Sequence, residues 1–152
     1  MNIKVNLQIA SKTKSIPTIE QFQKWADLIL INHIQGDQEL TIRIVDERES
    51  ALLNEKYRNK SGPTNILSFP ADIDPEFNYP LLGDLVICSP IIEKQANQNN
   101  KELLAHWAHM ITHGILHLLG HNHLTNKEAI IMEELETNIL MKFGFPPPYG
   151  EK

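Results

Sequence analysis

Three histidines in the C-terminal third of the chain limit the fold more than any other feature. The segment His113-Gly-Ile-Leu-His117-Leu-Leu-Gly120-His-Asn-His123 has two histidines four residues apart, then a glycine and a third histidine. Residues four apart on a helix share one face, one turn apart. Because glycine readily adopts the left-handed conformation that ends a helix, Gly120 can turn the chain and return His123 to that face. The fold must therefore end a helix here.

This arrangement is typical of a catalytic zinc site. Three neutral imidazoles leave the fourth tetrahedral position for water, whereas a structural site takes all four ligands from the protein. Ligand type and availability favour zinc over nickel or copper. We therefore predict one Zn²⁺ ion bound by His113, His117 and His123. The alternative is a group of partly buried, hydrogen-bonded histidines between core leucines.

The same histidine spacing occurs in metzincin peptidases, whose pattern is His-Glu-x-x-His-x-x-Gly-x-x-His. The glutamate of that pattern is the general base of the peptidase reaction. Position 114 is a glycine here, so the sequence keeps the metal ligands and lacks the base. This difference favours another hydrolytic reaction, with a metallopeptidase as an alternative.

Hydrophobic periodicity predicts a mixture of strands and helices. Strands are expected at residues 2–10, 39–45, 66–69 and 84–88, and helices at residues 18–33, after Asp46, from 89 to about 119, and from 125 to about 143. Asp46 can cap its helix, and Thr125 with Glu128 matches a capping box. The polar stretch 95–100 can interrupt the third helix, and a proline-rich connector at 70–82 is expected on the surface.

These elements predict one α+β domain over residues 1–152. We expect a mixed, mostly parallel four-stranded sheet covered by helices, with the metal site at the end of a long helix. The chain length suits a single hydrophobic core.

Charge and composition limit the function. The net charge of −5 at pH 7 disfavours a nucleic-acid partner, which usually selects a basic surface. Five cations in one part of the chain nevertheless allow a locally basic cleft, although a solvated charged face is the simpler interpretation. They are Arg43, Arg48, Lys56, Arg58 and Lys60.

The sequence predicts a cytoplasmic protein without a membrane partner. The single cysteine, Cys88, fits a reducing compartment. The N-terminal residues alternate between apolar and polar, whereas a signal peptide has an unbroken apolar run. The longest apolar stretches are shorter than the roughly 18 residues of a membrane span.

In the histidine segment described above, the sequence resembles the YbeY family of bacterial endoribonucleases, also described as rRNA maturation factors. Residues 113–120 and His123 match the family motif His-Gly-x-Leu-His-Leu-x-Gly-Tyr-Asp-His. The similarity extends to Tyr57-Arg58 and to residues 63–70 and 83–87, in the family's order.

The resemblance implies metal-dependent cleavage of single-stranded RNA, in small-subunit rRNA processing and ribosome quality control. It implies zinc on His113, His117 and His123, and matches Arg58 to the family's functionally important arginine. The implied partners are single-stranded RNA, rRNA and the small ribosomal subunit, and DNA is not expected. A non-catalytic ribosome assembly factor with a structural zinc is a further alternative.

Arg58 suits phosphate chemistry. A guanidinium can hold two phosphate oxygens and stabilise the negative charge of the transition state, which a lysine cannot do in the same way. The alternative role for Arg58 is a surface cation that complements a helix dipole. Thr64, Asn65 and Ser68 could line a cleft nearby, but turn chemistry explains the first two without a ligand.

One position departs from the family motif. The Tyr-Asp pair of the family is His121-Asn122 here. Asparagine can form hydrogen bonds but cannot act as a base. His121 could replace the base or act as a ligand, and we favour the simpler interpretation of an exposed turn residue.

Other polar residues have simpler interpretations. We expect three glutamates, Glu133, Glu134 and Glu136, to form the solvated face of the last helix. His109 could orient a metal ligand, but we expect an ordinary half-buried histidine. Asp84 is either a carboxylate that orients a ligand or a polar residue at a strand end. Cys88 is expected to be a buried apolar residue and not a fourth ligand.

Overall fold

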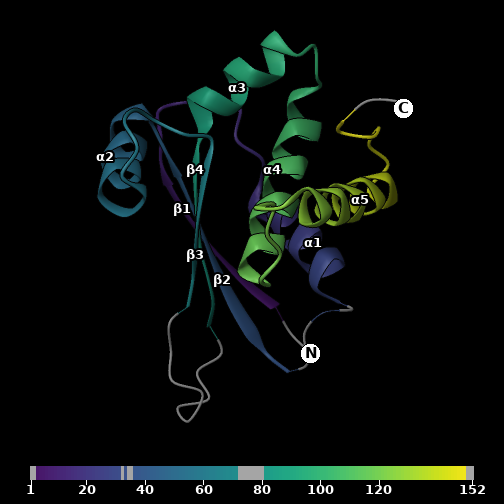
Figure 1. Ribbon diagram of the computed structural model, residues 1–152. Helices are drawn as coiled ribbons and strands as arrows, with labels where there is room; N and C mark the ends of the chain where they lie inside the picture. Colours follow the sequence, from purple (N-terminus) through teal and green to yellow (C-terminus); the bar gives the residue numbers. More distant parts are fainter. Residues whose placement is uncertain (1–2, 32, 34–35, 72–80, 150–152) are drawn as a thin grey trace.

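The computed structural model describes residues 3–31, 33, 36–71 and 81–149. Within these ranges four strands form one sheet with the order β1-β2-β4-β3 (Figure 1). Strand β2 is parallel to β1 and β4, whereas β3 is antiparallel to β4. The elements are β1 (Ile3–Ala10), α1 (Ile19–Leu30), β2 (Gln38–Val45), α2 (Glu47–Arg58), β3 (Ile66–Pro70), β4 (Leu81–Cys88), α3 (Ser89–Gln98), α4 (Leu103–Leu118) and α5 (Asn126–Lys142). The predicted α+β fold with a mixed, mostly parallel sheet is confirmed.

Alternation along the central strands creates two apolar clusters, one on each face of the sheet. In β4, Leu85 and Ile87 belong to the main core, whereas Val86 and Cys88 belong to a smaller cluster. This follows from the two-residue period of a strand. Helices α1 and α4 lie over the main core, and α2 lies on the other side of the sheet (Figure 1). The sheet therefore separates α2 from the histidine helix α4.

The long helix expected from residue 89 to about 119 is divided into α3 and α4. Asn100 lies between them with a left-handed φ of 52°, a conformation that asparagine tolerates better than most residues. This break lies at the end of the polar stretch 95–100, as the sequence predicts. Residues 72–80 of the expected surface connector lie outside the described residues. No helix in the described part of the chain has both the length and the hydropathy to cross a bilayer.

One of the predicted helix caps is wrong. Thr125 does cap α5, since its hydroxyl accepts from Glu128 N at 3.1 Å. Asp46 stands at the N-cap position of α2, but its carboxylate accepts instead from Ser11 Oγ and from Lys12 N. This carboxylate joins the segment after β1 to the start of α2. A contact distant in sequence has replaced the local one.

Helix α4 ends where the sequence predicts. Gly120 has a φ of 97°, and the N–H groups of Gly120 and His121 donate to the carbonyls of His117 and Leu116, both at 3.0 Å. This pair of bonds is a Schellman motif, which satisfies the free carbonyls of a helix end. The chain turns there and brings residues 121–123 back beside the last turn of α4.

Strands β3 and β4 approach each other closely at Gly83. A Cβ atom at this position would lie 2.5 Å from the carbonyl oxygen of Phe69, and the φ of Gly83 is 154°. Such a contact is too short for an L residue, and the conformation is rare for one. The close pairing places β3 against α4.

We predict that Gly83→Ala destabilises the protein by about 3 kcal/mol, because backbone strain adds to the clash with Phe69. Urea denaturation measures the loss. Gly62→Ala is the matched control, since Gly62 has a φ of 85° and nothing within 4 Å of a Cβ. Equal losses in the two variants would show that the backbone conformation alone is responsible.

Candidate metal centre

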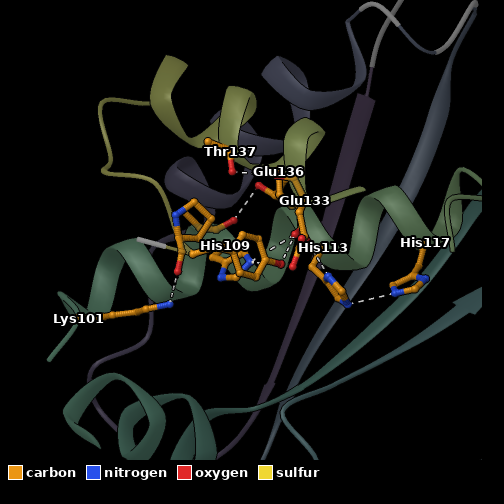
Figure 2. Close-up of polar contacts among 11 residues, drawn as sticks. Lys101, His109, His113, His117, Glu133, Glu136 and Thr137 are labelled. Atoms are coloured by element: carbon orange, nitrogen blue, oxygen red, sulfur yellow. Dashed lines mark hydrogen bonds and ion pairs between the residues drawn. The ribbon is translucent and has the colours of Figure 1, made fainter. Parts of the chain in front are cut away.

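Helix α4 and the turn after it bring the three predicted ligands together. The Nε2 atoms of His113 and His117 are 3.0 Å apart, and one ligand atom from each of His113, His117 and His123 lies within 4.8 Å of the others. His113 and His117 are half-buried, whereas His123 is exposed. Figure 2 shows the rings of His113 and His117 facing each other. The separations suit a single metal ion.

The His117 imidazole has the charge state that a metal ion requires. Burial is the main cause that lowers the pKa of His117 to about 4, and repulsion from His113 and His123 lowers it further. At neutral pH the ring is therefore neutral. Metal ions bind neutral imidazole and compete with protons for it. These donors fit Zn²⁺, for which imidazole nitrogen is a common ligand.

Glu136 overturns the expectation of a solvated face on the last helix. Its side chain is completely buried between α5 and α4. The Oε1 atom accepts a hydrogen bond from Nδ1–H of His113, and Oε2 accepts one from the hydroxyl of Tyr149. The physical reason is the placement of α5 across α4, which buries the stripe Met132, Glu136 and Leu140. In the sequence, this four-residue spacing places Glu136 on the same helix face as two apolar residues, which indicates its burial.

The pKa of Glu136 reflects a balance of opposing effects. Burial alone would raise it, but hydrogen bonds from His109, His113 and Tyr149 lower it to about 2. The carboxylate is therefore ionised at neutral pH. An ionised acceptor at Nδ1 fixes the proton of His113 on that atom and leaves Nε2 free to bind a metal.

Two further residues of this network were not assigned to the site from the sequence. His109 is 7% exposed, more buried than expected, and its Nε2 lies 3.6 Å from Oε2 of Glu136. Tyr149 comes from the C-terminal segment, and its hydroxyl lies 3.3 Å from the same nitrogen of His109. The hydroxyl donates to Glu136, so it accepts from His109 Nε2–H. Burial and the contact with Glu136 raise the pKa of Tyr149, which stays protonated.

Gly114 leaves no room for the glutamate of a peptidase. A Cβ atom at this position would lie 2.6 Å from Cδ1 of Ile66 and 2.8 Å from Cδ2 of Leu85. Position 114 thus faces the sheet and is packed against it. The sequence lacks the glutamate that serves as the peptidase base, and core residues fill the space that its side chain would need.

Two comparisons with known proteins identify the family and the fold. The sequence model of a family described as endoribonuclease YbeY matches residues 6–144. The chain belongs to the YbeY endoribonuclease family. Its fold is similar to the solution structure of TM1509 from Thermotoga maritima, with a TM-score of 0.58 and 22% sequence identity over 95% of this chain and 99% of that chain. Family membership makes the chain a hydrolase with RNA as its substrate class.

Arg58, which the YbeY resemblance singled out, is the last residue of α2. Its Nη2 donates to the carbonyl of Ser68 at 2.8 Å, on the edge strand β3. The guanidinium carbon lies 5.8 Å from the centre of the Phe69 ring. Ser68 also reaches α4, since its hydroxyl donates to the carbonyl of Gly114 at 3.4 Å. The structure thus joins Arg58 to the histidine helix through Ser68.

The other cations near Arg58 are not all free to bind an anion. Arg43 forms a two-point ion pair with Glu49, at 2.6 and 2.8 Å. Lys56 and Arg58 are exposed in the last turn of α2, where they also complement the helix dipole. The locally basic surface is therefore smaller than the five cations of the sequence suggest, because Arg43 is paired with Glu49.

The remaining candidates have structural roles or lie elsewhere. Thr64 N donates to Ser50 Oγ at 3.0 Å and Asn65 Oδ1 accepts from Ile66 N at 2.7 Å, as turn chemistry predicts. Asp84 is exposed and borders a groove with Arg43 on the α2 side of the sheet. Cys88 is 1% exposed in the smaller apolar cluster.

His106 should make the stability of the protein depend on pH. This residue is 5% exposed and its Nε2 lies 2.9 Å from Oε1 of Gln95. Burial first, and then repulsion from His109 and Lys101, lowers the pKa of His106 from 6.5 to about 4. Between these values the unfolded chain binds more protons than the folded one, so stability falls as pH falls.

We predict that His106→Gln flattens the stability profile between pH 6.5 and 4, where wild-type His106 costs up to about 3 kcal/mol. Urea unfolding at a series of pH values in the presence of a chelator measures the slope. His33→Gln is the control, because His33 is exposed. A slope that stays at the wild-type value in His106→Gln would assign the acid sensitivity to other groups.

Proposed function

We propose that this chain is a Zn²⁺-dependent endoribonuclease that cleaves single-stranded RNA in small-subunit rRNA maturation and ribosome quality control, in the cytoplasm. The observation that carries the metal chemistry is the convergence of His113, His117 and His123 at the end of α4. Zinc bound there would supply a water whose pKa is about 7. Membership of the YbeY family supports RNA as the substrate.

The chain's own residues take separate roles in this proposal. The three histidines bind the metal ion, and Glu136 orients His113. Arg58 holds the phosphate of the RNA: its guanidinium has five N–H donors, of which the described contact with Ser68 uses Nη2. The remaining N–H groups can donate to two phosphate oxygens and stabilise charge in the transition state.

A general base for the attacking water has to come from a position other than 114. Glu133, which is half-buried on α5, lines a cavity of about 240 Å³ together with His113 and His123. Glu136 borders the same cavity, but its two oxygens are engaged by His113 and Tyr149. Asn122 cannot accept the proton. We assign the general base to Glu133.

The first test separates metal binding from phosphate binding. His117→Ala is expected to lose zinc and activity, whereas Arg58→Ala keeps its zinc and cleaves single-stranded RNA about 10²- to 10³-fold more slowly. Elemental analysis and a cleavage assay with and without chelator measure both. Arg48→Ala is the matched control, as an exposed arginine of the same helix. Zinc-loaded wild-type protein that leaves RNA intact would refute the proposed activity.

The second test concerns the base. Glu133→Gln is expected to lower kcat by about 10²- to 10⁴-fold, the usual contribution of a general base, while zinc affinity stays unchanged. Glu134→Gln is the control, because Glu134 is the exposed neighbour of Glu133 on α5. Cleavage by Glu133→Gln at the wild-type rate would remove this residue from the mechanism.

Two alternatives make different predictions in the same assays. A metallopeptidase would hydrolyse a casein-type substrate, although the packing of Gly114 against Ile66 and Leu85 disfavours it. A non-catalytic assembly factor with a structural zinc would lose thermal stability on chelation and leave RNA intact, with a protein group as its fourth ligand.

A further inference from the structure

The C-terminal segment returns to the histidine helix after α5. Gly144, with a φ of 90°, turns the chain, and Phe145 N donates to the carbonyl of Leu140 at 3.0 Å. Phe145 packs against the main core. Farther along, Lys101 Nζ donates to the carbonyl of Pro148 at 2.8 Å, from the turn between α3 and α4 (Figure 2). Two anchors therefore fix residues 145–148 along α4.

This path delivers Tyr149 to the buried carboxylate. The ring of Tyr149 lies edge-to-face on His109, with centroids 5.3 Å apart and an interplanar angle of 87°. The ring is partly exposed, at 41%, but its hydroxyl donates to Oε2 of Glu136 and contacts His109 Nε2. The hydroxyl is thus held between a carboxylate oxygen and an imidazole nitrogen.

We propose that Tyr149 is a positioning residue for the metal centre, fixed in place by the anchored segment 145–148. By occupying Oε2 of Glu136, it keeps Oε1 on Nδ1–H of His113, so that His113 presents Nε2 to the ion. The inference rests on the zinc ligands of the proposed function and extends them to the C-terminal segment.

The chemistry of a carboxylate explains why its second oxygen needs a partner. A buried, ionised carboxylate loses free energy for each oxygen without a donor. Released from Tyr149, Glu136 can rotate toward another donor and leave Nδ1–H of His113 without its acceptor. His113 would then present Nε2 to the ion less well, and zinc would bind more weakly. The tyrosine hydroxyl therefore keeps Glu136 as a hydrogen-bond partner of His113.

A chain of contacts then links a distant lysine to the metal centre. Lys101 contacts Pro148, the next residue Tyr149 contacts Glu136, and Glu136 contacts His113. Lys101 and His113, the two ends of this series of contacts, are 12 positions apart in sequence. Lys101 precedes α4, and His113 lies within it. Removing the Lys101 ammonium should weaken metal binding without altering a ligand or its direct partner.

The experiment measures the Zn²⁺ affinity of the full chain by competition with a chromophoric chelator. Tyr149→Phe, which keeps the ring, is expected to raise the Kd for zinc about tenfold, the low end of the range for outer partners of metal ligands. Lys101→Met is also expected to raise the Kd for zinc. Two matched controls, Tyr57→Phe and Lys94→Met on exposed positions of α2 and α3, should leave it unchanged.

A double-variant cycle distinguishes positioning from general stability. If Tyr149 acts through Glu136, then Tyr149→Phe adds little to the loss already caused by Glu136→Gln. The visible spectrum of the Co²⁺-loaded protein should also change in Tyr149→Phe, because the orientation of the ligand His113 changes. Additive losses, or an unchanged Kd in Tyr149→Phe, would overturn the proposal.

The same measurements separate this inference from the proposed function. If zinc affinity responds as expected while zinc-loaded wild type leaves RNA intact, the positioning role stands and the nuclease activity fails. If wild type cleaves RNA and Tyr149→Phe binds zinc as tightly as wild type, the positioning role alone fails. Lys101→Met provides the decisive comparison if Tyr149→Phe does not fold.

Discussion

Burying a carboxylate in a helix interface costs free energy unless its oxygens find donors, and Glu136 meets this condition through partners from two other segments. His113 and His109 come from α4, Tyr149 from the C-terminal segment, and the carboxylate itself from α5. The contacts hold α5 across α4 and direct one imidazole. A single buried charge therefore connects the packing of the last third of the chain to the geometry of its metal centre.

Close packing of α4 on the sheet sets the chemistry that this centre can support. Gly114 lets the helix approach Ile66 and Leu85 so closely that a side chain there would displace core atoms. The neighbouring positions His113 and His117 point away from that contact and toward each other. Position 114 therefore has no room for a catalytic side chain, because its glycine lets α4 pack closely on the sheet. In the proposed reaction the base would come from a different helix, and α5 carries two glutamates that line the cavity beside His113 and His123.

Local features of the site could be predicted from the sequence, and features that need a partner element could not. The spacing of His113 and His117 and the helix end at Gly120 depend on a single helix and its turn. The alternation in β2 likewise predicts which face of that strand lies in the main core. Glu136 appeared to be a surface residue because its burial requires α5 to lie across α4. Tyr149 follows three prolines, where no periodicity indicates its position.

Charge gives the last constraint on how the proposed nuclease meets its substrate. The chain carries a net charge of −5, and Arg43 is neutralised by Glu49, so long-range attraction of a polyanion is weak. Few phosphate contacts also mean a shallow dependence of affinity on salt. In the proposed function, recognition would then depend on short-range contacts from Arg58 and a metal ion to one or two phosphates. Such contacts require an RNA segment that can approach closely, as an unpaired strand can and a rigid duplex cannot.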